Sequence, residues 1–286
     1  MNFLRTGFLL VLLTVLLVFI GQLIGGTQGA QTAFLIALAL NLLSYWFSDK
    51  MVLAMYRAKP LQEAEAPQVF RAVREIATRE GVPMPKLYWI ATKTPNAFAT
   101  GRSPKHAAVA VTAGLLEIMN EEELKGVLAH ELSHVKNRDT LVMTIAAALA
   151  GAIMMLARMA QWSLWMGGGR SRDDNNRSNA ALQLVALLLI IIVAPLAAML
   201  IQMAISRTRE YGADETGARL TGNPQGLASA LERLDQAAHA YPLPHANPAT
   251  AHLFIVNPLS AGAIATLFST HPPIQERVRR LRGMRL

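Results

Sequence analysis

Long apolar runs separated by polar stretches are the dominant pattern in this chain. No Asp, Glu, Lys, Arg or His occurs between Thr6 and Ser48. A glycine-rich stretch at 21–30 divides this segment into two apolar runs, 6–24 and 31–48. Each run is close to the ~20 residues that a membrane-spanning helix needs. The pattern therefore predicts an N-terminal transmembrane hairpin over residues 1–48.

A second pair of apolar runs covers residues 141–165 and 181–205, joined by a polar, glycine-rich connector at 166–180. The run at 141–165 contains one charged residue, Arg158, and the run at 181–205 contains none. Together with the hairpin, these runs predict about four transmembrane helices. An amphipathic or re-entrant segment at 141–165 is the alternative. A cleaved signal peptide is an alternative for the first run, although that run exceeds the usual signal core of roughly 7–15 residues.

The remaining parts, 49–140 and 206–286, have the periodicity of a mixed α+β domain. An apolar face repeats through Ala66–Glu80 and ends at Gly81, which predicts a helix. Short apolar runs predict strands at Lys86–Ala91 and Ala107–Thr112, with an edge strand within Thr94–Gly101. Further helices are predicted at 115–119, 121–136, 206–220, 224–240 and 274–281. The fold class is therefore a mainly α integral membrane protein whose two polar parts form one domain with a small β-sheet.

The sequence His-Glu-Leu-Ser-His at 130–134 carries the clearest chemistry. On a helix, His130 and His134 project from one face and can bind a single Zn²⁺, while Glu131 can act as a general base on a water that the metal activates. Asn120, ahead of Glu121–Glu123, is the expected N-cap of this helix. The metzincin pattern needs a glycine and a third histidine where this chain has Asn137 and Thr140, so that class is excluded.

A catalytic zinc usually takes a third protein ligand, which must come from further along the chain. The best candidates are Glu210 and Asp214, which share a helical face. One of them can bind zinc while the other holds a ligand histidine by its second ring nitrogen. Because His130 and Glu210 must lie on the same side of the membrane, an even number of crossings must separate them. The runs at 141–165 and 181–205 supply two crossings, or none.

The net charge of +8 indicates a membrane orientation rather than a nucleic-acid partner. Basic residues follow the second and fourth apolar runs and crowd the C-terminus, whereas the 21–30 connector has no charge. By the positive-inside rule, the N-terminus, the 49–140 part and the tail after 206 are cytoplasmic. No nucleic-acid recognition motif accompanies the arginines. The chain has no cysteine, so a disulfide framework is excluded.

Four motifs together resemble the M48 zinc metallopeptidases, including the heat-shock proteases of the bacterial inner membrane. They are His-Glu-Leu-Ser-His at 130–134, Arg-Glu-Tyr-Gly-Ala-Asp at 209–214, Asn-Ala-Phe-Ala-Thr-Gly at 96–101 and Ser-Thr-His-Pro-Pro at 269–273. The resemblance covers nearly the whole chain. It implies a multi-pass inner-membrane protein with its active site facing the cytoplasm and a gluzincin-like catalytic domain. It also implies that misfolded or damaged membrane proteins are its substrates, in quality control under stress.

The resemblance also assigns roles to residues. It implies one Zn²⁺ per chain held by His130, His134 and Glu210, with Glu131 as base and proton shuttle. Asp214 would support a ligand histidine. The remaining candidates, for the substrate backbone or the oxyanion, are Asn96 at the edge strand, His271 and Arg277.

Three other functions remain open at this stage. An intramembrane-cleaving protease is disfavoured because the charged residues at 121–125 and 136–139 flank the motif. The prenyl-protein protease branch of the same family shares the motifs but carries more spans. A zinc-binding scaffold without hydrolysis has no need of Glu131. The irregular 241–270 stretch is interpreted as a gate over the cleft.

Overall fold

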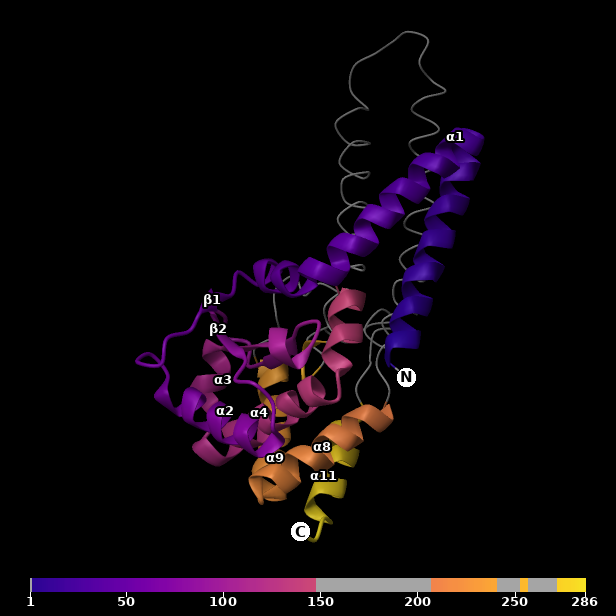
Figure 1. The fold of residues 1–286 in the computed structure, drawn as a ribbon. Coiled ribbons are helices and arrows are strands. Elements are labelled where there is room, and N and C mark those ends of the chain that lie inside the picture. The colour runs from indigo at the N-terminus through magenta and orange to yellow at the C-terminus, as the bar shows by residue number, and fades with distance from the viewer. Residues whose placement is uncertain (1, 148–206, 241–252, 257–271) are drawn as a thin grey trace.

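The two N-terminal apolar runs form a helical element that folds back on itself. The computed structural model describes residues 2–147, 207–240, 253–256 and 272–286 (Figure 1). Element α1, Asn2–Met55, turns at Gly26, whose φ of 58° is in the left-handed region that glycine adopts freely. Across the two legs, Asn41 Nδ2 donates a hydrogen bond to Thr14 Oγ1 at 2.9 Å. The N-terminal segment is therefore a helical hairpin, and its second leg continues to Met55.

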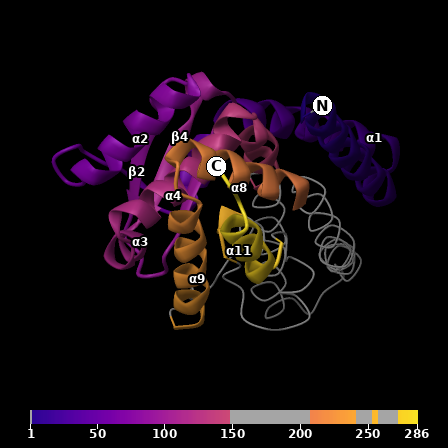
Figure 2. The same cartoon turned by 90° about the horizontal axis from the view of Figure 1, so that it is seen from below.

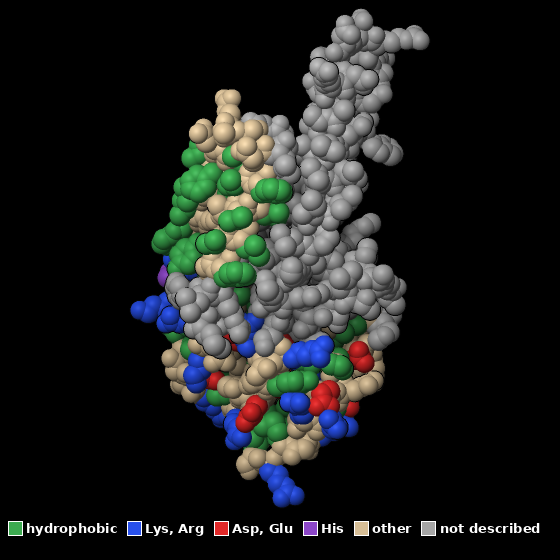
Figure 3. Space-filling view, turned by 90° about the vertical axis from the view of Figure 1, so that its right-hand side faces the viewer, with side chains coloured by type: hydrophobic (Ala, Val, Ile, Leu, Met, Phe, Trp, Pro, Cys, Tyr) green, Lys and Arg blue, Asp and Glu red, His purple; other side chains and the backbone are tan. Residues whose placement is uncertain are grey.

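The hairpin exposes large apolar side chains that a water-soluble protein would bury. They include Phe8, Phe19, Leu35 and Leu42. Figure 3 shows this hydrophobic column above a body that carries the charged side chains. Among the described residues, one stretch is long and apolar enough to cross a membrane, Gly26–Met55, and Leu10–Phe19 is a shorter apolar stretch. The hairpin surface is thus suited to lipid, while the predicted spans beyond residue 147 lie outside the described residues.

A small mixed sheet forms one layer of the body, by which we mean the described residues after Met55. Its strands are β1 (Lys59–Pro60), β2 (Lys86–Ile90), β3 (Ala97–Thr100) and β4 (Ala108–Thr112). The strand order is β1-β2-β4-β3, with β2 and β4 parallel and the other pairs antiparallel. The predicted strands are confirmed, and β3 lies at the edge as expected. Strand β1 escaped prediction because it is two exposed residues long and contains a proline.

Helices cover the sheet and surround one central helix. They are α2 (Pro67–Glu80), α3 (Ala113–Ile118), α4 (Glu121–Lys136), α8 (Arg207–Thr221), α9 (Pro224–Ala240) and α11 (Ile274–Arg282). These helices match the predicted ranges closely. Helix α4 contacts α2, α8, α9 and β3, and Figure 2 shows α8 and α9 beside it. The main apolar core lies between these elements and buries the α4 residues that flank the His-Glu-Leu-Ser-His motif.

The start of the predicted 141–165 run belongs to the body. Residues 139–147 are helical, and their apolar side chains are buried. Thr144 Oγ1 is 3.0 Å from Thr100 Oγ1 and accepts a hydrogen bond from Gly101 N at 3.3 Å, so this helix packs against the end of β3. The rest of that run, the 166–180 connector and the 181–205 run lie outside the described residues. The 241–270 stretch is described only at 253–256.

Candidate metal centre and active site

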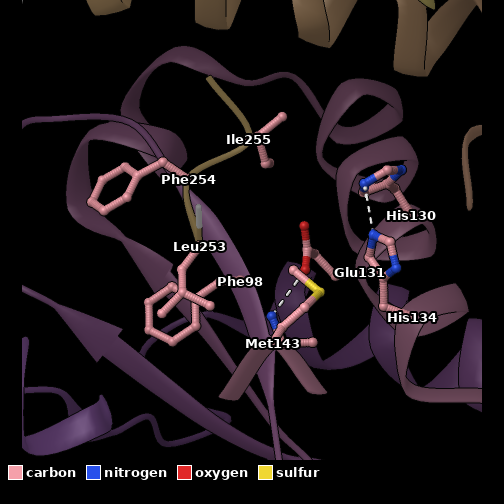
Figure 4. Close-up of a pocket in the computed structure, with 9 residues that line it drawn as sticks. Phe98, His130, Glu131, His134, Met143, Leu253, Phe254 and Ile255 are labelled. Atoms are coloured by element: carbon pink, nitrogen blue, oxygen red, sulfur yellow. Dashed lines mark hydrogen bonds between the residues drawn. The ribbon is translucent and has the colours of Figure 1, made fainter. Parts of the chain in front are cut away.

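Helix α4 brings the two motif histidines together. Its start is set by a reciprocal capping box: Asn120 Oδ1 accepts from Glu123 N at 2.9 Å, and Glu123 Oε2 accepts from Asn120 N at 3.0 Å. Asn120 is therefore the N-cap that the sequence predicts. One turn apart on the buried face, His130 and His134 approach with their Nε2 atoms 3.3 Å from each other. Both rings point into the same small volume (Figure 4).

Helix α8, which follows the undescribed residues 148–206 in sequence, provides the third polar group of the cluster. Glu210 Oε2 is 3.7 Å from His130 Nε2, and Glu210 Oε1 is 3.5 Å from His134 Nε2. The close approach of the helices depends on Gly217, because a Cβ there would lie 2.9 Å from the backbone nitrogen of His130. One atom each from His130, His134 and Glu210 lies within 4.8 Å of the others. Residues 80 positions apart in sequence thus form one cluster.

This cluster fits a zinc ion in donor type and in spacing. Tetrahedral zinc with bonds of ~2.0–2.1 Å to nitrogen and oxygen requires ligand atoms roughly 3.3–3.5 Å apart. The observed separations, 3.3, 3.5 and 3.7 Å, are close to that requirement. Two imidazoles and one carboxylate also match the ligand sets of catalytic zinc sites, which keep a fourth position open. Of the two carboxylates that the sequence left as alternatives, Glu210 is the one that lies in the cluster that could hold a metal.

Asp214 lies behind His130 instead. Its Oδ1 is 2.9 Å from His130 Nδ1, the ring nitrogen that faces away from the cluster. Burial alone would raise the pKa of Asp214, but the guanidinium of Arg277, together with the His130 ring, outweighs burial and lowers that pKa to about 2. Asp214 is therefore a stable anion that can orient the His130 ring.

Arg277 takes a different place from the one expected at an oxyanion or a substrate backbone. Its Nε and Nη2 atoms donate to the two carboxylate oxygens of Asp214 at 2.8 and 2.7 Å, and its side chain is completely buried. This bidentate pairing directs the guanidinium of α11 at Asp214, so Arg277 acts on His130 through that carboxylate. His271, the other candidate near the C-terminus, lies outside the described residues.

Asp139 is a site residue that the sequence analysis missed. Its Oδ2 is 3.4 Å from His134 Nδ1, and its Oδ1 is 3.7 Å from Arg209 Nη1. Burial lowers the pKa of His134, but Asp139 and the nearby carboxylates outweigh burial and raise it to about 9. Helix α4 has already ended where Asp139 occurs, and Arg138, with a φ of 57°, turns the chain back. An aspartate five residues after His134 was the available signal, but only that turn makes it face the ring.

Glu131 projects from α4 between the histidines and strand β3 (Figure 4). Its Oε2 accepts a hydrogen bond of 2.9 Å from Ala99 N, so an amide of the edge strand orients the carboxylate. Burial raises the pKa of Glu131, and with the nearby Glu210 carboxylate it exceeds the opposing effects of His130, His134 and the Ala99 amide. A carboxylate with a raised pKa is better matched to proton transfer near neutral pH than an ordinary one.

The space in front of Glu131 is a cavity of about 10 Å³, roughly the volume that one water occupies. Its lining comes from four parts of the body: Phe98, Ala99, His130, Glu131, His134, Met143, Leu253, Phe254 and Ile255. Asn96, the predicted substrate-binding residue, lies just before β3 and is buried. Its amide binds residues 253 and 255 of the same chain.

Comparison with known families agrees with this geometry. The model of peptidase family M48 matches residues 63–285, which include all three metal-cluster residues and Glu131. The chain belongs to peptidase family M48. A protease HtpX homolog from Syntrophobacter fumaroxidans is 59% identical over 280 residues, covering 98% of each chain. One from Pyrococcus furiosus is 56% identical over 279 residues, covering 97% of this chain and 94% of the other.

The fold of this M48 peptidase also resembles a solved structure. The crystal structure of S. mikatae Ste24p matches it with a TM-score of 0.51 at 20% sequence identity, covering 87% of this chain and 57% of that one. At that identity the likeness concerns the fold alone. The family and the names of the relatives make this chain a metallopeptidase, so the scaffold alternative is set aside, and they support a membrane protease.

Proposed function

We propose that this M48 peptidase is a zinc endopeptidase of the bacterial inner membrane that cuts misfolded or damaged membrane proteins on the cytoplasmic side. The observation that carries the proposal is the cluster of His130, His134 and Glu210 with Glu131 beside it and an edge strand next to Glu131. An edge strand can bind an extended peptide by adding it to the sheet, which suits unfolded substrates.

In the proposed reaction, His130, His134 and Glu210 would hold one zinc ion. A zinc ion held there would supply Lewis-acid chemistry, the kind that polarises a carbonyl and lowers the pKa of water toward about 7. Glu131 accepts a proton from the attacking water and later donates it to the leaving amine. The Ala99 amide keeps the Glu131 carboxylate oriented through both transfers.

The membrane and stress parts of the proposal have separate support. The exposed apolar hairpin requires a lipid partner, because burial in a bilayer removes its large apolar surface from water. Basic residues around the body favour a cytoplasmic active site, and the apolar runs along the sequence favour a multi-pass topology. A role in protein quality control under stress follows the family resemblance. Unfolded proteins and the bilayer are then its partners, and nucleic acid is not.

The test compares the zinc-loaded, detergent-purified chain with its Glu131→Gln variant on an unfolded protein substrate. We expect cleavage to fall by about 10²–10⁴-fold while zinc content stays the same, because the amide cannot accept the proton. Glu117→Gln, which alters an exposed carboxylate on α3, is the control and should cleave normally. Full activity in Glu131→Gln would rule out the proposed base.

A further inference from the structure

A short segment of the chain itself lines the cavity beside Glu131. We call residues Leu253–Val256 the 253–256 segment. Asn96 Nδ2 donates to the carbonyl oxygen of Leu253 at 3.3 Å, and Asn96 Oδ1 accepts from the amide of Ile255 at 3.1 Å. An asparagine amide bound to a C=O and an N–H two residues apart is how a side chain holds a peptide backbone irrespective of its sequence.

The side chains of this segment close the cavity beside Glu131. Leu253, Phe254 and Ile255 line it and are 3–4% exposed, and the Phe254 ring points away from Glu131 (Figure 4). With them in place, the cavity of about 10 Å³ has room for roughly one water. Pockets that bind organic ligands usually measure about 300–1,000 Å³. A peptide can therefore reach Glu131 only if this lining moves.

The surroundings of the segment are apolar and indicate what can replace it. Leu253 belongs to an apolar cluster that also contains Phe98 and, from α1, Val52 and Leu53. The Phe254 ring meets that of Tyr56 edge-on, with centroids 5.8 Å apart. Ile255 joins the main core instead. A second extended peptide could bind in these apolar surroundings only through large apolar side chains, because a charged side chain there would lose its hydration without gaining a partner.

Resting on the proposed function, we propose that the 253–256 segment is an internal competitor for the substrate groove. It occupies the hydrogen-bonding groups of the Asn96 amide and the apolar subsites that an extended, apolar substrate segment would need. The enzyme is closed while the segment is bound, and a substrate must displace it. Substrates are thereby restricted to stretches of large apolar residues in extended conformation, as unfolded membrane proteins expose them.

The absence of cysteine in the chain allows a direct test of displacement. An Ile255→Cys substitution keeps the backbone amide that donates to Asn96. It is made in a Glu131→Gln background, and the Glu131→Gln change prevents cleavage of the probe. The probe is a lysine-flanked peptide containing Leu-Phe-Ile-Val, and its binding is followed by fluorescence anisotropy. The control peptide has Ser in place of Leu and Ile. We expect saturating apolar peptide to speed thiol labelling at position 255 at least tenfold, and the serine peptide to leave it unchanged.

Matched variants separate displacement from general loosening. Ile76→Cys places a thiol in the same core, on α2, away from the cavity, and its labelling should stay slow with either peptide. Labelling of Phe254→Cys should be accelerated by the apolar peptide as labelling of Ile255→Cys is. This second variant shows that the acceleration does not come from a packing defect at position 255. If the apolar peptide binds while labelling at both segment positions stays constant or slows, the segment is a fixed wall and the proposal is wrong.

The labelling response does not depend on cleavage, so the two proposals can fail separately. A wild-type chain that cleaves peptides, with unresponsive thiols in the segment variants, would overturn the internal competitor alone. Responsive thiols in a zinc-loaded chain that never cleaves would support the competitor and overturn the endopeptidase.

Discussion

At the scale of residues, each histidine of the metal cluster has a carboxylate behind it that lies close to an arginine. The two series are His130–Asp214–Arg277 and His134–Asp139–Arg209. A carboxylate at Nδ1 keeps the proton on that nitrogen and leaves Nε2 free for the metal. In both rings it is Nε2 that faces the cluster. The tautomer and the orientation that zinc needs are therefore prepared by groups that do not touch it.

Removing the carboxylate behind His134 should weaken the site without disturbing the fold. We expect Asp139→Asn to lower zinc affinity about 10–100-fold, measured by competition with a chelator, because the neutral amide orients the ring poorly. Glu215→Gln removes an exposed carboxylate from α8 and should bind zinc normally. An unchanged affinity in Asp139→Asn would show that His134 is positioned without it.

The Asp214–Arg277 pair predicts a particular acid sensitivity. The pKa of Asp214 is about 2 in the folded chain against an ordinary value of 3.8. A lowered carboxyl pKa adds stability that is complete above the unfolded value and is lost as the pH falls from about 4 to about 2. The contribution is about 2 kcal/mol. Urea unfolding of the metal-free protein between pH 2 and 5 should show this loss in the wild type and a smaller one in Asp214→Asn. Identical slopes would contradict the pairing.

At the scale of elements, the site depends on how closely α8 lies against α4. A Cβ at Gly217 would lie 2.9 Å from His130 N and 3.2 Å from the Ala129 carbonyl carbon, and neither backbone atom can move aside. Gly217→Ala should therefore push α8 away, shift Glu210 and lower both zinc affinity and cleavage at least tenfold.

Gly212→Ala is the matched control, because the same helix has open space there. Alanine should stabilise that position by about 0.5–1 kcal/mol, visible as a higher midpoint of thermal unfolding, with zinc affinity unchanged. Equal zinc affinity in the two variants would mean that close packing at Gly217 does not position Glu210.

The elements also show what sequence reasoning can and cannot reach. Local signals located α2 and α4: apolar periodicity for the first, and the Asn120 cap for the second. The role of Asp139 depended on one left-handed residue, Arg138, which carries no signature in the sequence. The bonds between Asn96 and the 253–256 segment join residues more than 150 positions apart. Such pairings follow from tertiary packing, which no local pattern encodes.

At the scale of the whole molecule, the candidate active site lies beside the end of the hairpin that joins the body. The guanidinium of Arg102 stacks over the Trp46 ring at 4.4 Å, and Lys50 lies near the Phe47 ring. Aromatic and basic residues of this kind gather at the membrane surface. Tyr56, just past α1, contacts Phe98 of the cavity lining. The cavity lining therefore contacts Tyr56, which is ten residues along the chain from Trp46 at the expected lipid boundary.

This arrangement leads to a prediction of orientation that the cysteine-free chain can test. Single cysteines at Thr27, Lys59 and Arg285 occupy exposed positions at the hairpin turn, at β1 and at the C-terminus. Because basic residues border the body and none borders the turn, we expect an impermeant maleimide to label Thr27→Cys in intact cells. Lys59→Cys and Arg285→Cys should be labelled only after permeabilisation. Labelling of Lys59→Cys in intact cells would place the active site outside the cytoplasm, where cytoplasmic ends of misfolded proteins could not reach Glu131.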